Sequence, residues 1–216
     1  ISACLVGSEM CIRDSAQPHP YEIAVFGKPG SGKSSLINRL LETELLPVNT
    51  MPITAMPVRI VDGSEPRLRV SFLDRVEELP VSRLTEFGTG ESNPGNSKRV
   101  VALEVSAQSR RLQQGCAFLD MPGIGYFAAG ETQFASAYLP GSSLALVLVD
   151  GRSSIGPGEL GLMRALAAAS IPAFVMVSKC DLLPPGDVEQ VVTSFRDTLA
   201  QHLDSVPEVI PTGSMN

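Results

Sequence analysis

A glycine-rich segment near the start of the chain has the residue types and spacing that hold a row of phosphates. It consists of Gly27, Lys28, Pro29, Gly30, Ser31, Gly32, Lys33 and Ser34, and it fits the pattern G-x-x-x-x-G-K-[S/T]. Glycines allow backbone N–H groups to close around phosphate oxygens, and the N-terminus of a following helix adds a favourable dipole. We expect Lys33 to reach the β- and γ-phosphates and the Ser34 hydroxyl to coordinate Mg²⁺. Ser35 completes the predicted nucleotide contacts of this segment.

A second segment, Asp120-Met121-Pro122-Gly123, resembles the D-x-x-G element of GTP-binding proteins. We expect Asp120 to hold Mg²⁺ through a water, and the Gly123 N–H to bind the γ-phosphate and release it after hydrolysis. Thr54 is predicted to complete the Mg²⁺ shell with its hydroxyl, and Thr50 is the alternative. The predicted metal site is therefore Ser34, Thr54 and Asp120, and the residues expected to support catalysis are Lys33, Ser34, Thr54 and Gly123. A buried aspartate in a turn is the plainer interpretation of Asp120.

A third segment, Ser178-Lys179-Cys180-Asp181, resembles the [N/T]-K-x-D signature that selects guanine. The carboxylate of Asp181 can accept two hydrogen bonds from guanine, whereas adenine offers no such pair of donors and would leave the carboxylate unpaired. The stem of Lys179 is expected to pack across the base and ribose. Ser178 keeps a hydroxyl where Asn or Thr is usual. A surface turn with ordinary charges is the alternative.

Further along, the segment Pro211-Thr212-Gly213-Ser214 occupies the place of a last base-contacting loop. Its backbone N–H groups, at Gly213 and Ser214, are predicted to face the base oxygen.

These segments follow apolar runs that read as strands, and longer amphipathic runs lie between them. The expected strands are 22–27, 116–119, 144–149, 173–177 and 209–210, and the expected helices are 33–41, 131–139, 159–169 and 187–202. Such alternation predicts an α/β fold with a mostly parallel sheet and helices on both faces. This context favours the phosphate-binding interpretation of residues 27–34 over a simple glycine turn.

The stretch between residues 54 and 120 is expected to add strands to this pattern. Residues 58–61 and 68–73 read as strands joined in a hairpin around Asp62-Gly63. Residues 81–87 are consistent with a short helix, residues 88–97 with a loop, and residues 99–105 with another strand. Arg110 and Arg111 read as a charged pair in a loop.

The composition bounds the possible functions. The chain has 216 residues, of which 44% are hydrophobic and 19% charged, with a formal net charge of −6. This length suits one domain with its own core. No apolar run approaches the roughly 20 residues of a membrane-spanning helix. The acidic balance without a basic patch gives no reason to expect nucleic-acid binding. Cys116 and Cys180 read as isolated reduced thiols, which favours a cytoplasmic location.

The two ends of the sequence carry separate expectations. Residues 1–15 (ISACLVGSEMCIRDS) resemble a translated sequencing adapter, so we treat them as an artefactual or disordered segment. Residues 16–216 are predicted to be one domain. Because no helix follows the last expected strand, the chain is expected to be truncated before further regions.

The order of these motifs resembles the GTPase domain of the dynamin superfamily, and bacterial dynamin-like proteins most of all. The distinguishing features are the spacing P-x-x-x-x-P-x-T-x-x-P from Pro47 to Pro57 and the long stretch from Thr54 to Asp120. The resemblance covers roughly residues 21–216. It implies the three-layer P-loop NTPase fold of a G domain, with extra strands between the two switch segments. It also implies Mg²⁺-dependent conversion of GTP to GDP and a homodimer across the nucleotide face. Absent helical regions would supply peripheral membrane association.

Two departures from the family pattern concern hydrolysis. Pro29 and Gly30 stand where dynamins usually carry a Gln-Ser pair that orients water, and Ile124 stands where Ras-like enzymes have a catalytic Gln. A GTP-binding switch with negligible turnover therefore stays open. The segment GKPGSGKSSLINRLL also resembles the phosphate loops of Era-like and immunity-related-type GTPases, so these two alternatives stay open as well. Tyr126 and Phe127 are consistent either with packing or with a dimer interface.

Overall fold

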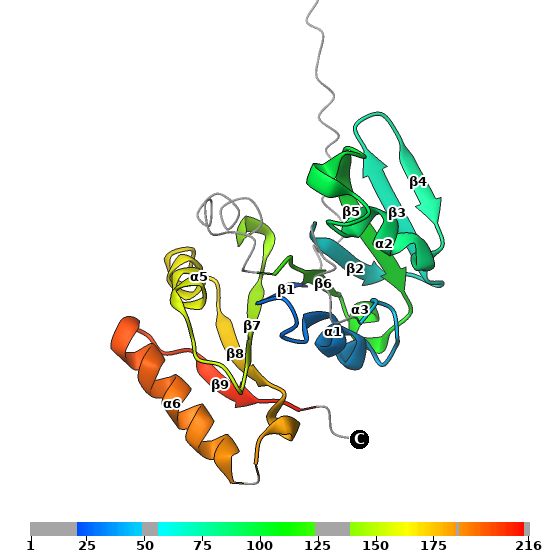
Figure 1. The fold of residues 1–216 in the computed structure, drawn as a ribbon. Coiled ribbons are helices and arrows are strands. Elements are labelled where there is room, and N and C mark those ends of the chain that lie inside the picture. Colours follow the sequence, from blue (N-terminus) through cyan, green and yellow to red (C-terminus); the bar gives the residue numbers. More distant parts are fainter. Residues whose placement is uncertain (1–20, 49–55, 124–138, 185, 214–216) are drawn as a thin grey trace, which may run out of the picture.

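The computed structural model describes residues 21–48, 56–123, 139–184 and 186–213. The strands within these residues form one nine-stranded sheet, with helices packed against it (Figure 1). The order of the strands is β4-β3-β5-β2-β6-β1-β7-β8-β9. Their bounds are β1 Tyr21–Gly27, β2 Val58–Asp62, β3 Arg67–Phe72, β4 Val76–Leu79, β5 Val100–Ala107, β6 Cys116–Asp120, β7 Leu144–Asp150, β8 Ala173–Ser178 and β9 Glu208–Pro211. The α-helices are α1 Lys33–Leu41, α2 Leu84–Gly88, α3 Arg110–Gln113, α5 Pro157–Ala168 and α6 Asp187–His202, with short 3₁₀ turns at Val81–Arg83, Pro94–Asn96, Leu139–Gly141 and Cys180–Leu182.

One half of the sheet is wholly parallel and positions the predicted motifs. β6, β1, β7, β8 and β9 run in the same direction, so their carboxyl ends meet at one edge. Val25 pairs with Asp120 on one side and with Leu146 on the other, which sets the register at that edge. The apolar runs of the sequence become strands buried on both faces. The mostly parallel sheet that the sequence predicts is therefore confirmed.

The other half of the sheet corrects one prediction. β2 and β3 do not form a hairpin around Asp62-Gly63, because β5 lies between them, parallel to β2 and antiparallel to β3. The connection instead crosses the end of β5, where the Gly63 N–H donates to Ala107 O at 3.1 Å. A Cβ at Gly63 would lie 2.6 Å from Ser106 Cβ, so the glycine permits this close crossing. The hairpin of this region joins β3 to β4, an edge strand that the sequence analysis missed.

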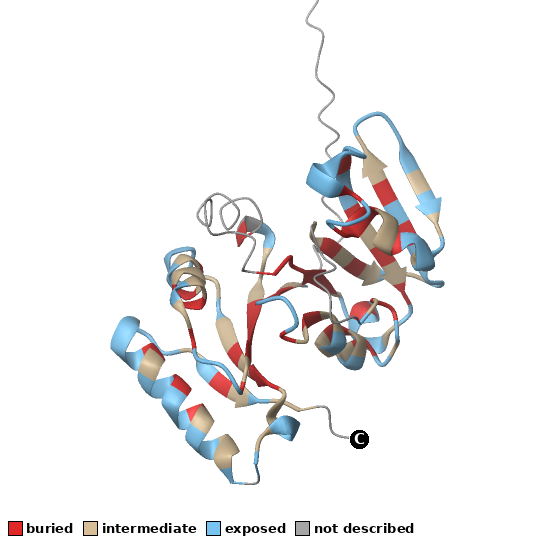
Figure 2. Ribbon diagram, in the orientation of Figure 1, coloured by how far each residue is buried: buried red, intermediate tan, exposed pale blue. Residues whose placement is uncertain are grey.

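Helices cover both faces of the sheet, and the buried apolar residues form two core clusters, one on each face. Figure 2 shows the buried residues in red along the central strands and on the sides of the helices that face them. On one face α5 and α6 pack on β1, β7 and β8 through residues such as Leu166 and Phe195. On the other face α1, α2 and α3 pack through Ile37, Phe87 and Leu112 onto β1, β2, β3 and β5. The expectation of helices on both faces is confirmed.

The local predictions differ from the structure in a few further places. Residues 81–87 form a 3₁₀ turn followed by α2, in agreement with the expected short helix. Arg110 and Arg111 begin the short helix α3 instead of lying in a loop, and Arg111 Nε donates to Leu40 O at the end of α1 at 2.8 Å. The helix expected over 131–139 lies outside the described residues except at its last position. Among the described helices, none has the length and apolarity to span a bilayer.

Candidate nucleotide-binding site

The phosphate end of the site is the turn between β1 and α1. Gly27 ends β1 with φ +151°, and a Cβ there would lie 2.5 Å from Ser31 Oγ and 2.6 Å from Leu148 O. Only a residue without a side chain fits between the neighbouring strand and the returning turn. Ser31 N–H donates to Lys28 O at 3.1 Å, and Gly30 and Gly32, both with positive φ, carry the chain round into α1.

Lys33 begins α1 and is 7% exposed. Its Nζ donates to Gly27 O and to Lys28 O, both at 3.1 Å, so the ammonium is held against the carbonyls of the turn. Burial lowers the pKa of Lys33, and the nearby Asp120 carboxylate acts in the opposite direction. A cation desolvated in this way gains strongly from an anion. The arrangement therefore suits a phosphate.

Ser34 and Asp120 meet beside this turn, as the sequence predicts for a metal site. Ser34 Oγ donates to Asp120 Oδ2 at 2.8 Å, and Asp120 is 2% exposed. Asp120 Oδ1 is buried and has no hydrogen-bond partner within the described part of the chain. Burial raises the pKa of Asp120 to about 6, against the effects of Ser34 and Lys33.

This pair has the chemistry of a Mg²⁺ site. Mg²⁺ takes oxygen ligands and is usually held by one or two protein oxygens together with substrate phosphates and waters. An orphaned buried carboxylate oxygen beside a hydroxyl fits that demand. No group of three or more His, Cys, Asp or Glu side chains forms a metal cage in residues 21–48, 56–123, 139–184 and 186–213. Thr54 and Thr50, the alternatives for the third ligand, lie outside the described residues.

Gly123 packs directly on the phosphate turn. A Cβ at this position would lie 2.6 Å from Pro29 Cγ and 2.8 Å from Pro29 N. The close approach to Pro29 therefore requires a glycine at this position. Pro29 presents a ring to this contact and no polar side-chain group. Ile124 lies outside the described residues.

The base end of the site is assembled from the ends of β7, β8 and β9. Lys179 adopts the left-handed conformation with φ 61°, and its Nζ donates to Asp150 Oδ2 at 2.9 Å. Asp150 also accepts from Arg152, whose Nη2 lies 2.8 Å from Oδ2. The hydrogen bonds from Arg152 and Lys179 hold the pKa of Asp150 well below its usual range. Ser178 Oγ donates to Val149 O at 3.3 Å and so belongs to the strand ends.

The β8 and β9 ends are fastened to each other. Thr212 N–H donates to Val177 O at 2.7 Å, and Cys180 N–H donates to Thr212 O at 3.1 Å. A Cβ at Gly213 would lie 3.1 Å from both the backbone N and Oδ1 of Asp181, which brings the two loops into contact. Ser214 lies outside the described residues. The described part of the predicted base-binding set is thus brought together.

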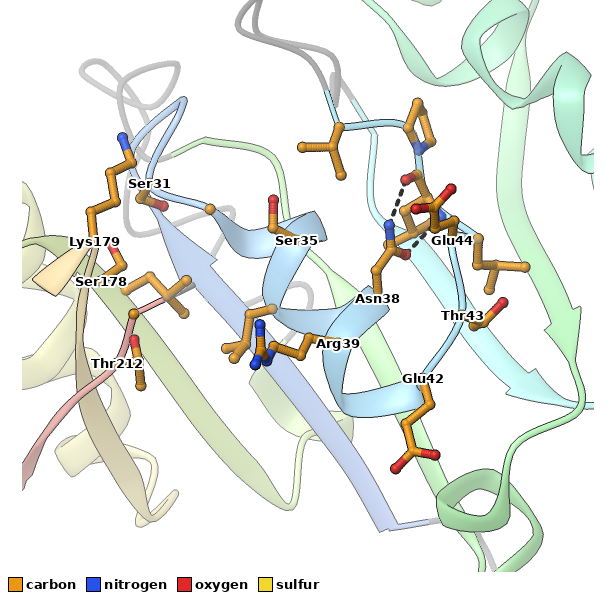
Figure 3. Close-up of a pocket in the computed structure, with 18 of the residues that line it drawn as sticks. Ser31, Ser35, Asn38, Arg39, Glu42, Thr43, Glu44, Ser178, Lys179 and Thr212 are labelled. Carbon is orange, nitrogen blue, oxygen red and sulfur yellow. Dashed lines mark hydrogen bonds between the residues drawn. The ribbon is translucent and has the colours of Figure 1, made fainter. Parts of the chain in front are cut away.

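A cavity of about 1540 Å³ joins the two ends. Its lining includes Ser31, Gly32 and Ser35 from the phosphate end and Lys179, Asp181 and Gly213 from the base end. Figure 3 shows Ser31, Ser178, Lys179 and Thr212 on one side of α1. The cavity continues past α1 to residues 42–48 on its other side. There the side-chain amide of Asn38 makes two hydrogen bonds with the backbone of Leu46: Asn38 Nδ2 donates to Leu46 O at 2.7 Å, and Leu46 N–H donates to Asn38 Oδ1 at 2.8 Å (Figure 3).

Sequence reasoning missed three side chains of this region. Asp150 and Arg152 were not singled out, although Asp150 follows a buried strand at the same sheet edge as Asp120. Glu159 of α5 was also missed, and it forms an ion pair with Lys28 at 2.8 Å. Lys28 was predicted among the nucleotide contacts, but its side chain turns away toward α5 and only its backbone shapes the phosphate turn.

Comparison with known proteins gives a consistent result. The family model described as "Dynamin family" matches residues 23–165. An uncharacterized protein in the xynA 3' region of Caldicellulosiruptor sp. (strain Rt8B.4) is 26% identical over 183 residues, which are 84% of this chain and 46% of that protein. The probable GTP-binding protein EngB of Rhodopseudomonas palustris (strain TIE-1) is 30% identical over 166 residues, covering 64% of this chain and 77% of EngB.

Two solved chains share the fold. They come from work on an oligomerised bacterial dynamin pair that provides a mechanism for long-range sensing and tethering of membranes. One aligns with a TM-score of 0.70 at 16% identity over 91% of this chain, and the other with 0.66 at 20% identity over 89%. The chain spans 40% and 31% of these two proteins, and about half of the Caldicellulosiruptor relative.

Proposed function

The chain belongs to the dynamin family, and on that premise we propose that it binds Mg²⁺ and GTP and hydrolyses GTP to GDP and phosphate. The observation that carries the proposal is the convergence of three predicted motifs at one edge of the sheet, two of which line the same cavity. The phosphate turn follows β1, Asp120 ends β6, and the Lys179–Asp181 segment follows β8, all at the same sheet edge. Ligands of open α/β sheets bind at the carboxyl ends of parallel strands.

The phosphate end and the base end of the site have distinct roles in this proposal. Lys33 neutralises the β- and γ-phosphates, and the Gly123 N–H binds the γ-phosphate against Pro29. Asp181 accepts from the guanine N1–H and N2–H₂ groups, Lys179 packs across the base and ribose, and the N–H groups of Gly213 and Ser214 face the base oxygen. These contacts reject ATP because adenine would leave the Asp181 carboxylate unpaired.

Mg²⁺ would be held by Ser34 and Asp120, with Thr54 completing its shell. When bound, Mg²⁺ neutralises charge that develops on the transferred phosphoryl group. The residues of this chain orient the phosphates and exclude water from them. Lys33 is the side chain that contributes most, since it is already desolvated and needs no reorganisation as charge develops.

We further propose that hydrolysis is slow in the isolated chain and faster in a homodimer formed across the nucleotide face. Pro29 fills the approach to Gly123 with an apolar ring, so a group that orients the attacking water would come from elsewhere. The solved relatives form an oligomerised bacterial dynamin pair, which supports association between copies. On the same likeness we also propose peripheral membrane association through regions outside this chain. We propose no nucleic-acid partner.

A GTP-binding switch with negligible turnover is the second candidate. The same Pro29–Gly123 contact favours it, because the ring of Pro29 presents no polar group beside Gly123. In this case the nucleotide would order the segments around Thr54 and Gly123 for a partner protein.

The experiment that separates the two candidates is phosphate release in Mg²⁺ over a range of protein concentrations, with GTP or ATP as substrate. The proposal predicts GTP-dependent release whose rate per molecule rises with protein concentration. A rate per molecule that stays constant contradicts stimulation by dimerisation. Tight GTP binding without release at any concentration favours the switch.

A further inference from the structure

The second residue of the phosphate turn is tied to a helix outside the nucleotide site. Lys28 Nζ lies 2.8 Å from Glu159 Oε1 in the first turn of α5. The Lys28 side chain is 49% exposed, while that of Glu159 is 1% exposed. The half-exposed ammonium of Lys28 thus pairs with the buried carboxylate of Glu159.

Glu159 depends on this cation. Its Oε2 accepts the Gly156 N–H at 3.0 Å, which caps the N-terminus of α5. Its Oε1 accepts no hydrogen bond of good geometry within the described part of the chain, so the ion pair with Lys28 balances its charge. A buried charge that loses its partner is strongly destabilising, so the pair is held together by the cost of separation.

The backbone of Lys28 shapes the phosphate turn at the same time. Lys28 O accepts the Ser31 N–H and one of the two hydrogen bonds from Lys33 Nζ, both at 3.1 Å. The position of this carbonyl therefore determines the curvature of the turn and the position of the Lys33 ammonium. Anything that fixes Lys28 fixes both.

From these contacts we propose that Lys28 is a positioning residue that orders the phosphate turn through the buried Glu159 carboxylate of α5. The inference rests on the proposed GTP binding and deepens it. Lys28 does not touch the nucleotide in this account, because its ammonium is committed to Glu159. Without the ion pair the Lys28 carbonyl is no longer held in place, and the Lys33 ammonium that donates to it loses its fixed position. The affinity of the protein therefore falls for GTP and GDP alike.

The test compares nucleotide affinity in four variants: Lys28→Met, Lys28→Arg, Glu159→Gln and Lys28→Met/Glu159→Gln. Kd for fluorescent GTP and GDP analogues is measured together with the thermal midpoint of the nucleotide-free protein. We expect Lys28→Met and Glu159→Gln each to weaken the binding of both nucleotides by about tenfold, the upper end of what one intramolecular hydrogen bond contributes. The double variant should lose no more than the worse single variant, because both changes break one contact. Lys28→Arg, which keeps the charge, should restore most of the affinity.

The outcomes separate this inference from its rivals. If Lys28 bound phosphate directly, Lys28→Met would weaken binding while Glu159→Gln left Kd unchanged. If the pair only stabilised the fold, the thermal midpoint would fall with Kd unchanged. Either result overturns the proposal. If wild type itself fails to bind GTP, the proposed function fails instead, which is a separate result.

Two further variants serve as controls. Glu159→Asp keeps the buried charge but is one methylene shorter, so it replaces Glu159→Gln if that variant does not fold, with the same expected loss of affinity. Arg67, at the start of β3, forms an exposed ion pair with Glu65, and neither residue lines the cavity. Arg67→Met removes this cation and should change neither Kd nor the thermal midpoint.

Discussion

The phosphate end and the base end of the candidate site differ in how their charged side chains are paired. At the phosphate end, charged and polar groups are buried and incompletely paired: Lys33 is desolvated against backbone carbonyls, and Asp120 Oδ1 has no partner among the described residues. At the base end, Lys179 is one-third exposed, and Asp150 binds both Lys179 and Arg152. One end is left with groups that a ligand would satisfy, whereas at the other end these side chains already satisfy one another.

The difference indicates how binding free energy is divided between the two ends. Buried groups without partners gain most when a ligand supplies the missing charge, so the phosphate end should dominate affinity. A preassembled end loses little entropy on binding and discriminates by leaving a wrong partner unpaired, so the base end should dominate selectivity.

Lys33→Ala should have the largest effect. Removing the desolvated ammonium should weaken GTP and GDP by at least about a hundredfold, comparable to the loss of a preorganised donor to a developing charge. The thermal midpoint of the nucleotide-free protein should not fall, because burial of the Lys33 ammonium costs free energy that the alanine variant does not lose. Equilibrium binding and thermal unfolding check both parts. Lys98→Ala is the matched control for nucleotide affinity, because Lys98 is exposed and its Nζ donates to Glu86 O at 2.5 Å, outside the residues that line the cavity. Unchanged nucleotide affinity would contradict the role of the phosphate end.

The Mg²⁺ dependence of binding should vary with pH through Asp120. Its pKa is raised to about 6 in the metal-free protein, above the ordinary 3.8, so the fold favours the protonated form. The contribution of this group to stability is therefore present at low pH and lost as pH rises through about 6. Mg²⁺ needs the carboxylate, so the affinity for Mg²⁺ should fall about tenfold between pH 7 and pH 5.

A Mg²⁺ titration of nucleotide binding at several pH values measures this effect. Asp120→Asn is the control, because it keeps the titration of the nucleotide's own phosphates but removes the carboxylate. A pH dependence that is the same in wild type and Asp120→Asn would exclude Asp120 as the source.

Asp150→Asn should have a smaller effect, which sharpens the contrast between the two ends. The Lys179 ammonium would lose its charged partner, and we expect GTP affinity to fall about fivefold, the value of one modest hydrogen bond. The same measurement on Asp74→Asn provides a matched control, since Asp74 pairs with an arginine at the turn between β3 and β4. A loss as large as that of Lys33→Ala would reverse the proposed division.

The elements that carry the motifs could be predicted because their signals are local. The helix at Lys33–Leu41 was predicted with the bounds that the structure shows, since glycines fix its start and its apolar spacing is helical. The buried strands β6, β7 and β8 follow from short continuous apolar runs. Together they place the phosphate turn, Asp120 and Asp181 at one sheet edge.

The errors concern pairings between distant residues. Asp62-Gly63 has the composition of a hairpin turn, but the strand that separates β2 from β3 comes about forty residues later, at Val100–Ala107, and its register is set by tertiary packing. β4 is a short edge strand, Val-Glu-Glu-Leu, with two adjacent glutamates and no apolar run. The partners of Lys28 and Lys179 lie on α5 and at the end of β7, so no local pattern in the sequence identifies them.

The most direct test of this account is competition of GTP, GDP and ATP for the site in Mg²⁺, in wild type and in Asp181→Asn. We expect GTP to bind at least about a hundredfold more tightly than ATP, because the two nucleotides share the same phosphates and only guanine can donate two hydrogen bonds to Asp181. In Asp181→Asn the preference over ATP should collapse while the protein stays folded. Equal competition by ATP in the folded wild type would contradict the assignment of Asp181 and with it the central claim.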